Sequence, residues 1–398
     1  MKTKAALPVE TTQILVVGGG PVGLCAALSA ARRGLQVTLL EQSFRGYGPG
    51  HASILHPSSV RLMSELGLSH QLQSAGRQLG SVQLYNDGIV AASANLPLPA
   101  LSLSQTALED TLLKALRREK VRIKSGCQVS ALEQGKDCVR ATVVRRELVT
   151  LGSPADYSEW QAIDSSTIEA RFVIGADGYD STVRSALGIA SVQAGPTETF
   201  AMFETPAFTA ESAFRLSFAA GFVNAIFPLA ERRERWGFQL GSELSREPDL
   251  EFLRELLTRR APFVVGVPER VEWSVVTHFE RRLARRFGSQ RTWLAGDAAH
   301  VTSPFGGQSM NGGLSEVSEL VELMASCIFQ HQPLATLEHW AAEREREWRQ
   351  LLGTSVEVDT LPGTPSWLRE QAPRLIPALP ASGRDLQHLL RELGLLVH

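Results

Sequence analysis

Residues 13–41 read QILVVGGGPVGLCAALSAARRGLQVTLLE, and this stretch decides the fold. The apolar run 13–17 is typical of a strand that is buried on both faces. Residues 21–33 carry the small side chains of a helix that packs closely on a sheet, and residues 35–40 predict a second strand. The order strand, glycine-rich turn, helix, strand predicts a parallel α/β unit.

The turn has the spacing G-x-G-x-x-G, with Gly18, Gly20 and Gly23. Glycines permit a turn that no side chain would fit and let a phosphate approach the backbone, and the helix N-terminus offers it free N–H groups. Glu41 ends the second strand, where a carboxylate accepts hydrogen bonds from ribose hydroxyls. The unit therefore predicts a dinucleotide site, and it does not distinguish FAD from NAD. The alternative is a glycine-rich turn that binds no ligand.

Two later segments complete a three-part pattern. Residues 171–184, RFVIGADGYDSTVR, predict a buried strand, a tight turn at Asp177 and Gly178, and a helix capped by Ser181. Residues 292–312, TWLAGDAAHVTSPFGGQSMNG, predict a strand that delivers Asp297 to a ribityl chain. The loop rich in Pro and Gly that follows it presents backbone N–H groups to the edge of a flavin ring.

In this order and spacing the three motifs resemble those of the class A flavoprotein monooxygenases, the aromatic hydroxylase family that includes para-hydroxybenzoate hydroxylase. The resemblance covers residues 13–345. It implies FAD as cofactor, NADH or NADPH as a transient reductant and molecular oxygen as co-substrate. The implied reaction is hydroxylation of an aromatic or polycyclic small molecule through a flavin C4a-hydroperoxide.

The implied fold is α/β, with a Rossmann-type FAD-binding domain interleaved with a smaller, mostly antiparallel β-sheet substrate domain. Because the three motifs must converge, we expect the FAD-binding domain to comprise residues 1–80, 100–190 and 276–345. Residues 81–99 and 191–275 are left for the substrate domain, and 346–398 for a C-terminal helical segment. Five prolines in 360–383 argue against one continuous helix there, and 384–396 are expected to form a last helix.

The resemblance also assigns site residues. It implies that FAD is held by Gly18, Gly20, Pro21, Val22, Gly23, Glu41, Gln42, Arg45, Gln105, Asp177, Gly178, Gly296, Asp297, Pro304, Gly307, Gln308, Ser309, Met310 and Asn311. Pro304, Gly306 and Gly307 are expected to wall the site of the oxygen reaction.

The chain departs from the family pattern at four positions. His51 and Ser58 stand where many members carry Arg, and the first of those arginines commonly lies near the flavin and helps to govern its reduction. Arg45 is a candidate substitute. Ser309 replaces a usual Gly and Glu316 a usual Asp, so the loop over the flavin is expected to differ in conformation.

Candidates for contact with the substrate are weaker. His51, His278 and Tyr85 are possible bases for drawing a proton from a phenol, each with a purely structural role as the alternative. His300 is expected to pack near the flavin site. Arg215 is interpreted as a partner for a substrate carboxylate or as a solvated strand residue, and the arginines in 232–235 and 281–286 as exposed faces without function.

Composition limits the other classes of function. A net charge of −2 and a pI near 6.5 argue against a nucleic-acid partner. Four scattered cysteines predict neither a metal site nor a disulfide, and the first 12 residues lack the apolar core of a signal peptide. Glycines break the apolar run 14–31, so no integral membrane span is expected. A cytoplasmic monomer or homodimer is the expectation.

The alternatives within the same fold are a flavin-dependent epoxidase, halogenase or double-bond reductase. From another class, a flavin-containing binding protein with impaired turnover also fits, because of the departures at His51 and Ser58. The sequence leaves open the substrate and the choice between NADH and NADPH.

Overall fold

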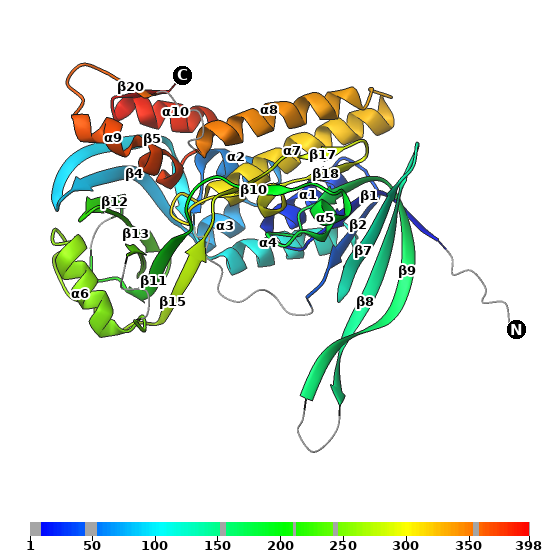
Figure 1. Ribbon diagram of the computed structural model, residues 1–398, viewed down its shortest axis with the longest axis horizontal. Coiled ribbons are helices and arrows are strands. Elements are labelled where there is room, and N and C mark those ends of the chain that lie inside the picture. Colours follow the sequence, from blue (N-terminus) through cyan, green and yellow to red (C-terminus); the bar gives the residue numbers. More distant parts are fainter. Residues whose placement is uncertain are drawn as a thin grey trace, which may run out of the picture.

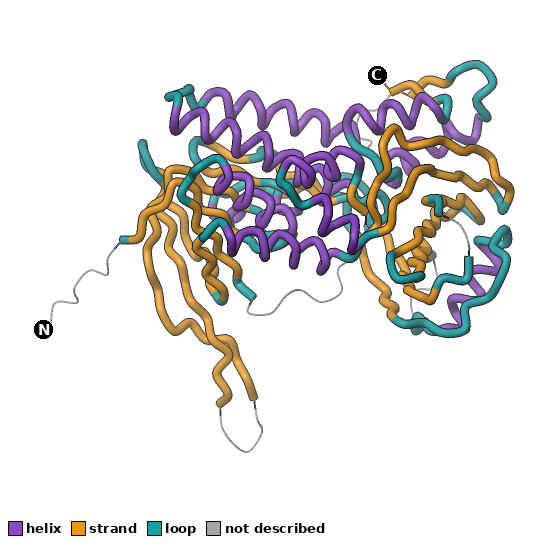
Figure 2. Tube along the Cα trace, turned by 180° about the vertical axis from the view of Figure 1, so that it is seen from behind, coloured by secondary structure: helices purple, strands orange, loops and turns teal. Residues whose placement is uncertain are grey.

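The computed structural model describes residues 9–43, 54–151, 157–209, 212–241, 246–352 and 358–397. Two large sheets divide these residues into two bodies, with helices between and above them (Figures 1 and 2). The mixed α/β class predicted from the sequence is confirmed. The division into an FAD-binding and a substrate-binding domain stays a prediction. None of the helices in these ranges is long and apolar enough to cross a membrane.

The first sheet brings the three motifs side by side. Its central path runs β17 (Gly288–Ser289), β18 (Thr292–Leu294), β9 (Tyr157–Gly175), β1 (Glu10–Val17), β2 (Val37–Glu41) and β6 (Arg122–Ser125). β1 pairs in parallel with β2 and β9, and β9 pairs in parallel with β18. The carboxyl ends of four adjacent strands therefore lie at one edge, which is where open α/β sheets bind their ligands.

Among the described residues, seven helices pack on this sheet or on one another beside it, and their buried residues join its apolar core. They are α1 (Pro21–Arg32), α2 (Pro57–Glu65), α3 (Ser69–Ala75), α4 (Gln105–Arg118), α5 (Thr182–Ala186), α7 (Gln308–Phe329) and α8 (Ala335–Leu351). Helix α1 is buried along most of its length and packs against α7 and α4. The glycine-rich turn is thereby fixed between the sheet and the helix that begins the third motif.

A ribbon extends this sheet away from the body. β7 (Cys127–Gln134) and β8 (Val139–Leu151) pair antiparallel with each other, and β8 pairs with the first part of β9. The far ends of β8 and β9 project beyond the rest of the molecule (Figure 1). A small separate sheet joins β10 (Ser191–Gln193), β16 (Arg282–Ala284) and β19 (His300–Val301).

The second sheet is antiparallel except for one parallel pair, β12 with β4. Its order is β15 (Trp273–Phe279), β11 (Glu198–Pro206), β14 (Arg233–Leu240), β13 (Phe222–Leu229), β12 (Phe214–Ala219), β4 (Arg77–Asn86), β5 (Ile89–Ser102) and β3 (Ile54–Leu55). One face packs on α6 (Leu250–Arg260). The other face carries Phe305 and the C-terminal segment.

The C-terminal segment is broken, as the prolines predicted. It comprises β20 (Val358–Thr360), α9 (Ser366–Leu375), the short helix η2 (Ile376–Ala378), α10 (Gly383–Glu392) and β21 (Leu395–Val397). It also contacts α2, because the Ser382 and Ser58 hydroxyls lie 3.0 Å apart and Arg61 forms an ion pair of 2.7 Å with Asp385. Ser58, where the family usually has Arg, thus lies at a close contact between segments.

Candidate functional site

The glycine-rich turn has the geometry that its sequence predicts. Gly18 has φ +106°, and a Cβ there would overlap the carbonyl oxygen of Ala176, the residue that follows β9. A Cβ on Gly23 would overlap the carbonyl oxygen of Gly18. At Gly20 a Cβ would meet nothing within 4 Å, and no side chain caps the helix that begins at Pro21. The helix N-terminus therefore borders open space suited to a pyrophosphate.

Glu41 lies against this turn. Its Oε2 accepts a hydrogen bond of 2.6 Å from the Gly19 N–H, and its Oε1 one of 2.7 Å from Ser43. The Gln105 amide donates to Glu109 at 2.7 Å. Burial, and the nearby negative charges that include Glu41, raise the pKa of Glu109. Polar groups of β2 and α4 thus meet beside the turn, and they include Glu109, to which the sequence had assigned no role.

Asp177 lies beside the turn, but its carboxylate accepts hydrogen bonds from residues at the start of α5. Oδ1 accepts from the Ser181 hydroxyl at 2.6 Å, and Oδ2 accepts from the Thr182 and Val183 N–H groups at 2.7 and 3.1 Å. Ser181 accepts from the Arg184 N–H, as a cap should. The side chain of Asp177 therefore fixes the start of α5, and only its backbone faces Gly18.

The third motif reaches the turn through Gly296. This glycine has φ +61°, and a Cβ there would press on Val22 of α1. Asp297 follows in the short helix η1 (Gly296–Ala298), and its side chain is exposed. The surrounding protein nevertheless raises the pKa of this carboxyl through burial. This carboxyl is closely surrounded by protein but still open on one side, so it suits hydrogen bonds with the hydroxyls of a ribityl chain.

The loop before α7 is fixed by side chains from three segments. Asn311 donates to the Ile54 and Gly307 carbonyl oxygens, both at 2.8 Å, and accepts from the His56 N–H at 2.7 Å. Ser309 Oγ accepts from the Thr302 N–H at 2.9 Å. Ser309, unlike the usual Gly, ties the start of the loop to the first turn of α7.

The C-terminal segment closes the other side of this loop. A Cβ on Gly306 would overlap the Pro377 carbonyl oxygen. Gln308 is buried and donates to the carbonyl oxygens of Leu379 and Ala381 at 2.8 and 2.9 Å. The side chain of Gln308 thus holds the C-terminal segment.

Phe305 inserts into the second sheet. It is 2% exposed, and its ring lies 4.8 Å from that of Phe200 in an edge-to-face contact. A Cβ on Gly237 would overlap the Phe305 ring and crowd the Met202 sulfur. The loop Pro304–Gly307 is therefore held between the second sheet and the C-terminal segment.

His56 is a loop-positioning residue that sequence reasoning did not find. It is fully buried, its Nε2 lies 2.6 Å from the Gly306 carbonyl oxygen, and burial lowers its pKa to about 4. The ring is therefore neutral and donates from Nε2. Its contact lies 250 residues away in the sequence, so no local pattern indicates it.

Acid is expected to weaken the fold through His56. Below the ordinary pKa of 6.5 the unfolded chain takes up a proton that the folded ring refuses until about pH 4. About 3 kcal/mol of stability is present above pH 6.5 and lost as the pH falls to 4. Urea unfolding across this range should show the loss in the wild type and less of it in His56→Gln, whose amide keeps a donor. Equal losses in both proteins would contradict the assignment.

A buried polar cluster lies behind the third motif. The Nε2 of His300 is 2.8 Å from the Glu316 carboxylate, which also accepts from the Trp348 indole N–H and from the Gly296 N–H. The His300 ring stacks on Trp348 with centroids 3.5 Å apart. His300 packs next to the motif, as expected, and Glu316 in place of Asp carries the cluster.

Other candidates lie away from the loop or outside the description. Arg45 and His51 fall outside the described residues. Tyr85 stacks on Phe263 beneath α6 with centroids 3.6 Å apart, and His278 is exposed and bonded to Thr199. Both occupy the face of the second sheet opposite Phe305.

Two arginines that were interpreted as solvated are buried, which removes one of the two interpretations of Arg215 and corrects the expectation for Arg235. Arg215 is 3% exposed and faces α6, so it is not a solvated strand residue. Arg235 is 2% exposed and pairs with Glu204 on the face that carries Phe305. The two arginines lie on opposite faces of the sheet because side chains two residues apart on a strand share a face. Arg235 shares its face with Gly237, which lies under Phe305. Arg215 shares its face with Ser217, which donates a hydrogen bond to α6.

Comparisons with known proteins agree with this geometry. The FAD binding domain family model matches residues 11–355. The chain is 26% identical over 344 residues to 6-methylpretetramide 4-monooxygenase of Streptomyces rimosus, covering 83% of this chain but 59% of that protein. It is 25% identical to para-nitrophenol 4-monooxygenase of Pseudomonas sp. (strain WBC-3), covering 90% and 88%.

A solved structure shows the same fold. The p-nitrophenol 4-monooxygenase of Pseudomonas putida DLL-E4 superposes with a TM-score of 0.73 at 21% identity, covering 96% of this chain and 94% of that one. The open space at Gly20 would suit the phosphates of FAD, and the Glu41 and Asp297 carboxyls would suit its hydroxyls. Because the family model spans all three motifs, the chain belongs to the FAD binding domain family that these flavin-dependent monooxygenases of aromatic compounds share.

Proposed function

We propose that this protein is an FAD-dependent, NAD(P)H-driven monooxygenase that hydroxylates an aromatic or polycyclic small molecule. The observation that carries the proposal is the meeting of the carboxyl ends of β18, β9, β1 and β2 beside a loop clamped against a second sheet. When bound, FAD supplies the chemistry that oxygen lacks unaided: it accepts electrons from NADH or NADPH and activates molecular oxygen.

The residues of this chain would bind and orient that group. The turn at Gly18–Gly23 and the N-terminus of α1 would hold the pyrophosphate, and Glu41 the ribose. Asp297 would accept hydrogen bonds from the ribityl hydroxyls. The N-terminus of α7 after Gly307 carries a partial positive charge, which favours negative charge on a reduced ring.

The clamped loop would keep water from the reaction. Phe305 is buried in the second sheet and Pro377 lies directly against Gly306, so the loop is held from both sides. A fixed, water-poor wall places the substrate and preserves reactive species from hydrolysis. His56 and Asn311 hold that wall without themselves taking part in proton transfer.

The test combines a spectrum with oxygen consumption. Purified protein should show flavin bands, and a phenol, nitrophenol or aromatic acid should stimulate equal consumption of reduced nicotinamide and oxygen. Mass spectrometry should find one added oxygen atom in the product. If the substrate reoxidises the flavin without oxygen uptake, a reductase replaces the hydroxylase; if no FAD binds at all, the proposal is refuted. The cytoplasmic location and the choice of monomer or homodimer stay predictions.

A further inference from the structure

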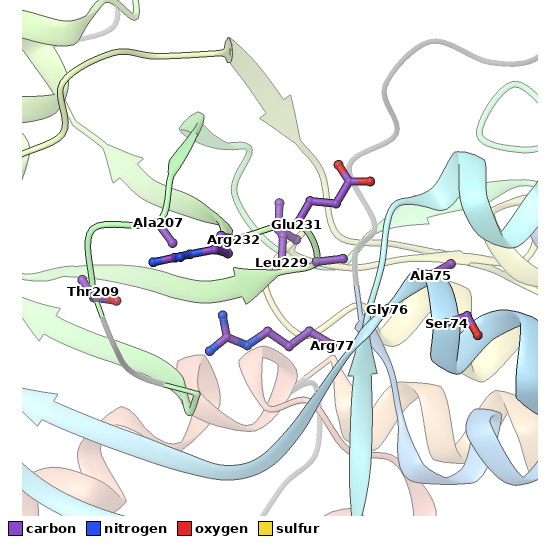
Figure 3. A pocket seen from close by; sticks show the side chains of 10 residues that line it. Ser74, Ala75, Gly76, Arg77, Ala207, Thr209, Leu229, Glu231 and Arg232 are labelled. Atoms are coloured by element: carbon purple, nitrogen blue, oxygen red, sulfur yellow. The ribbon is translucent and has the colours of Figure 1, made fainter.

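A pocket of about 570 Å³ opens where the first body meets the β13–β14 hairpin. The end of α3 and the start of β4 form one side of it, and residues 229–232 with Ala207 and Thr209 form the other (Figure 3). Arg77 and Arg232, from opposite sides, extend across it in the same direction, while Glu231 points elsewhere. Both arginines line the same pocket.

The pocket lies at the end of the second sheet where β13 turns into β14. Strand register places Met202 opposite Gly237 beneath Phe305, then Glu204 opposite Arg235, and then Pro206 opposite Arg233. Leu229 pairs with Arg233 in this last row and lines the pocket. Four residues of strand separate the first row from the last, roughly 13 Å. A molecule of two or three aromatic rings matches that length, and the buried side chains of Glu204 and Arg235 lie between the two rows.

The turn that carries Arg232 is held by the fold. Glu231 and Arg232 have φ of +56° and +55°, which residues with side chains rarely adopt. The Ala207 N–H donates to the Arg232 carbonyl oxygen at 2.7 Å and fixes the turn to β11. The backbone of the turn is therefore fixed, and the exposed side chain of Arg232 extends from it.

Within the described residues, the charges around the pocket leave Arg232 without a carboxylate partner. Glu231 pairs with Arg233 at 3.6 Å. Glu234 is buried and accepts from the Thr209 hydroxyl; burial raises its pKa, and the charges of Arg215 and Arg77 oppose that rise. Arg77 thus partly neutralises Glu234. Among the residues that the structure describes, no carboxylate pairs with Arg232.

We propose that this pocket binds an oxyanion through Arg232 and Arg77, and that the oxyanion is a carboxylate at the far end of a multi-ring aromatic substrate. This inference rests on the proposed function and names the substrate class for the same site. A guanidinium suits a carboxylate because its donors match the two oxygens. Leu229 and Ala207 supply the apolar contact for the adjoining ring.

The experiment is calorimetry on the purified full chain with matched ligand pairs. The probes are 3-hydroxybenzoate, 6-hydroxy-2-naphthoate and 4′-hydroxybiphenyl-4-carboxylate, each beside its uncharged carboxamide. We expect the wild type to prefer the longer carboxylates about tenfold over their amides, with the preference weakening in salt. Arg232→Gln should remove the preference without changing amide affinity, and Glu231→Gln, on the same turn, should retain it.

The outcomes separate the two proposals. Calorimetry needs no turnover, so a protein that lacks FAD or oxygen uptake refutes the proposed function while the carboxylate preference is still measured. The inference is overturned if the wild type does not prefer carboxylates over carboxamides, or if the Arg232→Gln variant keeps that preference. If Arg232→Gln instead raises the KM for NADPH but not for NADH, the oxyanion is the phosphate of the reductant and the substrate assignment is wrong.

Discussion

Gly23→Ala is expected to yield a protein that purifies without FAD. The added methyl would overlap the Gly18 carbonyl oxygen, so either the turn opens or α1 moves off the sheet. Overpacking of this kind costs about 1–3 kcal/mol of stability, and the displaced turn no longer presents its N–H groups to a pyrophosphate. Absorbance of flavin relative to protein after dialysis against FAD measures the loss, which we expect to exceed tenfold.

Gly20→Ala is the matched control. A Cβ at Gly20 meets nothing within 4 Å, so the thermal midpoint should stay that of the wild type. If the pyrophosphate lies over this residue, FAD affinity should still fall. Two variants that lose FAD with equal destabilisation would show that the turn matters only for folding, and a Gly23→Ala protein with full FAD would contradict the packing argument.

His300→Leu is expected to cost about 3–5 kcal/mol, since it leaves the Glu316 carboxylate buried without its ring partner. Burial alone would raise the pKa of Glu316, but His300, Trp348 and the Gly296 N–H hold it below its ordinary value of 4.5. The cluster therefore stabilises the fold above pH 4.5, and this contribution is lost as the pH falls through the lowered pKa. Because Glu316 accepts from the Gly296 N–H, FAD affinity should fall as well.

The double variant His300→Leu with Glu316→Gln separates charge from packing. Removing the carboxylate removes the unpaired charge, so the double variant should be more stable than His300→Leu alone. Urea unfolding at pH 7 gives both values. A double variant that is less stable by the sum of the two single changes would show that the residues act independently.

The motifs were predictable because each one is local. Glycine spacing, a terminal carboxylate and a strand before each motif are all visible within about 30 residues, and parallel pairing then brings them together. The α/β class followed from the same patterns and is confirmed. Asp177 shows the limit of such a prediction. Its sequence context predicts a binding site, but it does not tell which groups donate hydrogen bonds to the carboxylate oxygens.

Contacts between distant segments were not predictable. His56 meets Gly306, and Trp348 meets Glu316, only after the chain has folded. The alternation in Arg233–Leu240 indicates that Arg235 and Gly237 share a face. It does not tell which face Phe305 will cover, so a buried arginine was interpreted as an exposed one.

The contacts that hold the C-terminal segment also bear on the order of folding. The contacts of Ser58 with Ser382 and of Arg61 with Asp385 each join residues 324 positions apart. Pairings of such long range form late, because the entropy of closing the chain between them is lost before any contact compensates for it. We therefore expect the C-terminal segment to settle against the loop Pro304–Gly307 late in folding. In the proposed function, the chain would then acquire its sheets before it could protect a reduced flavin from water.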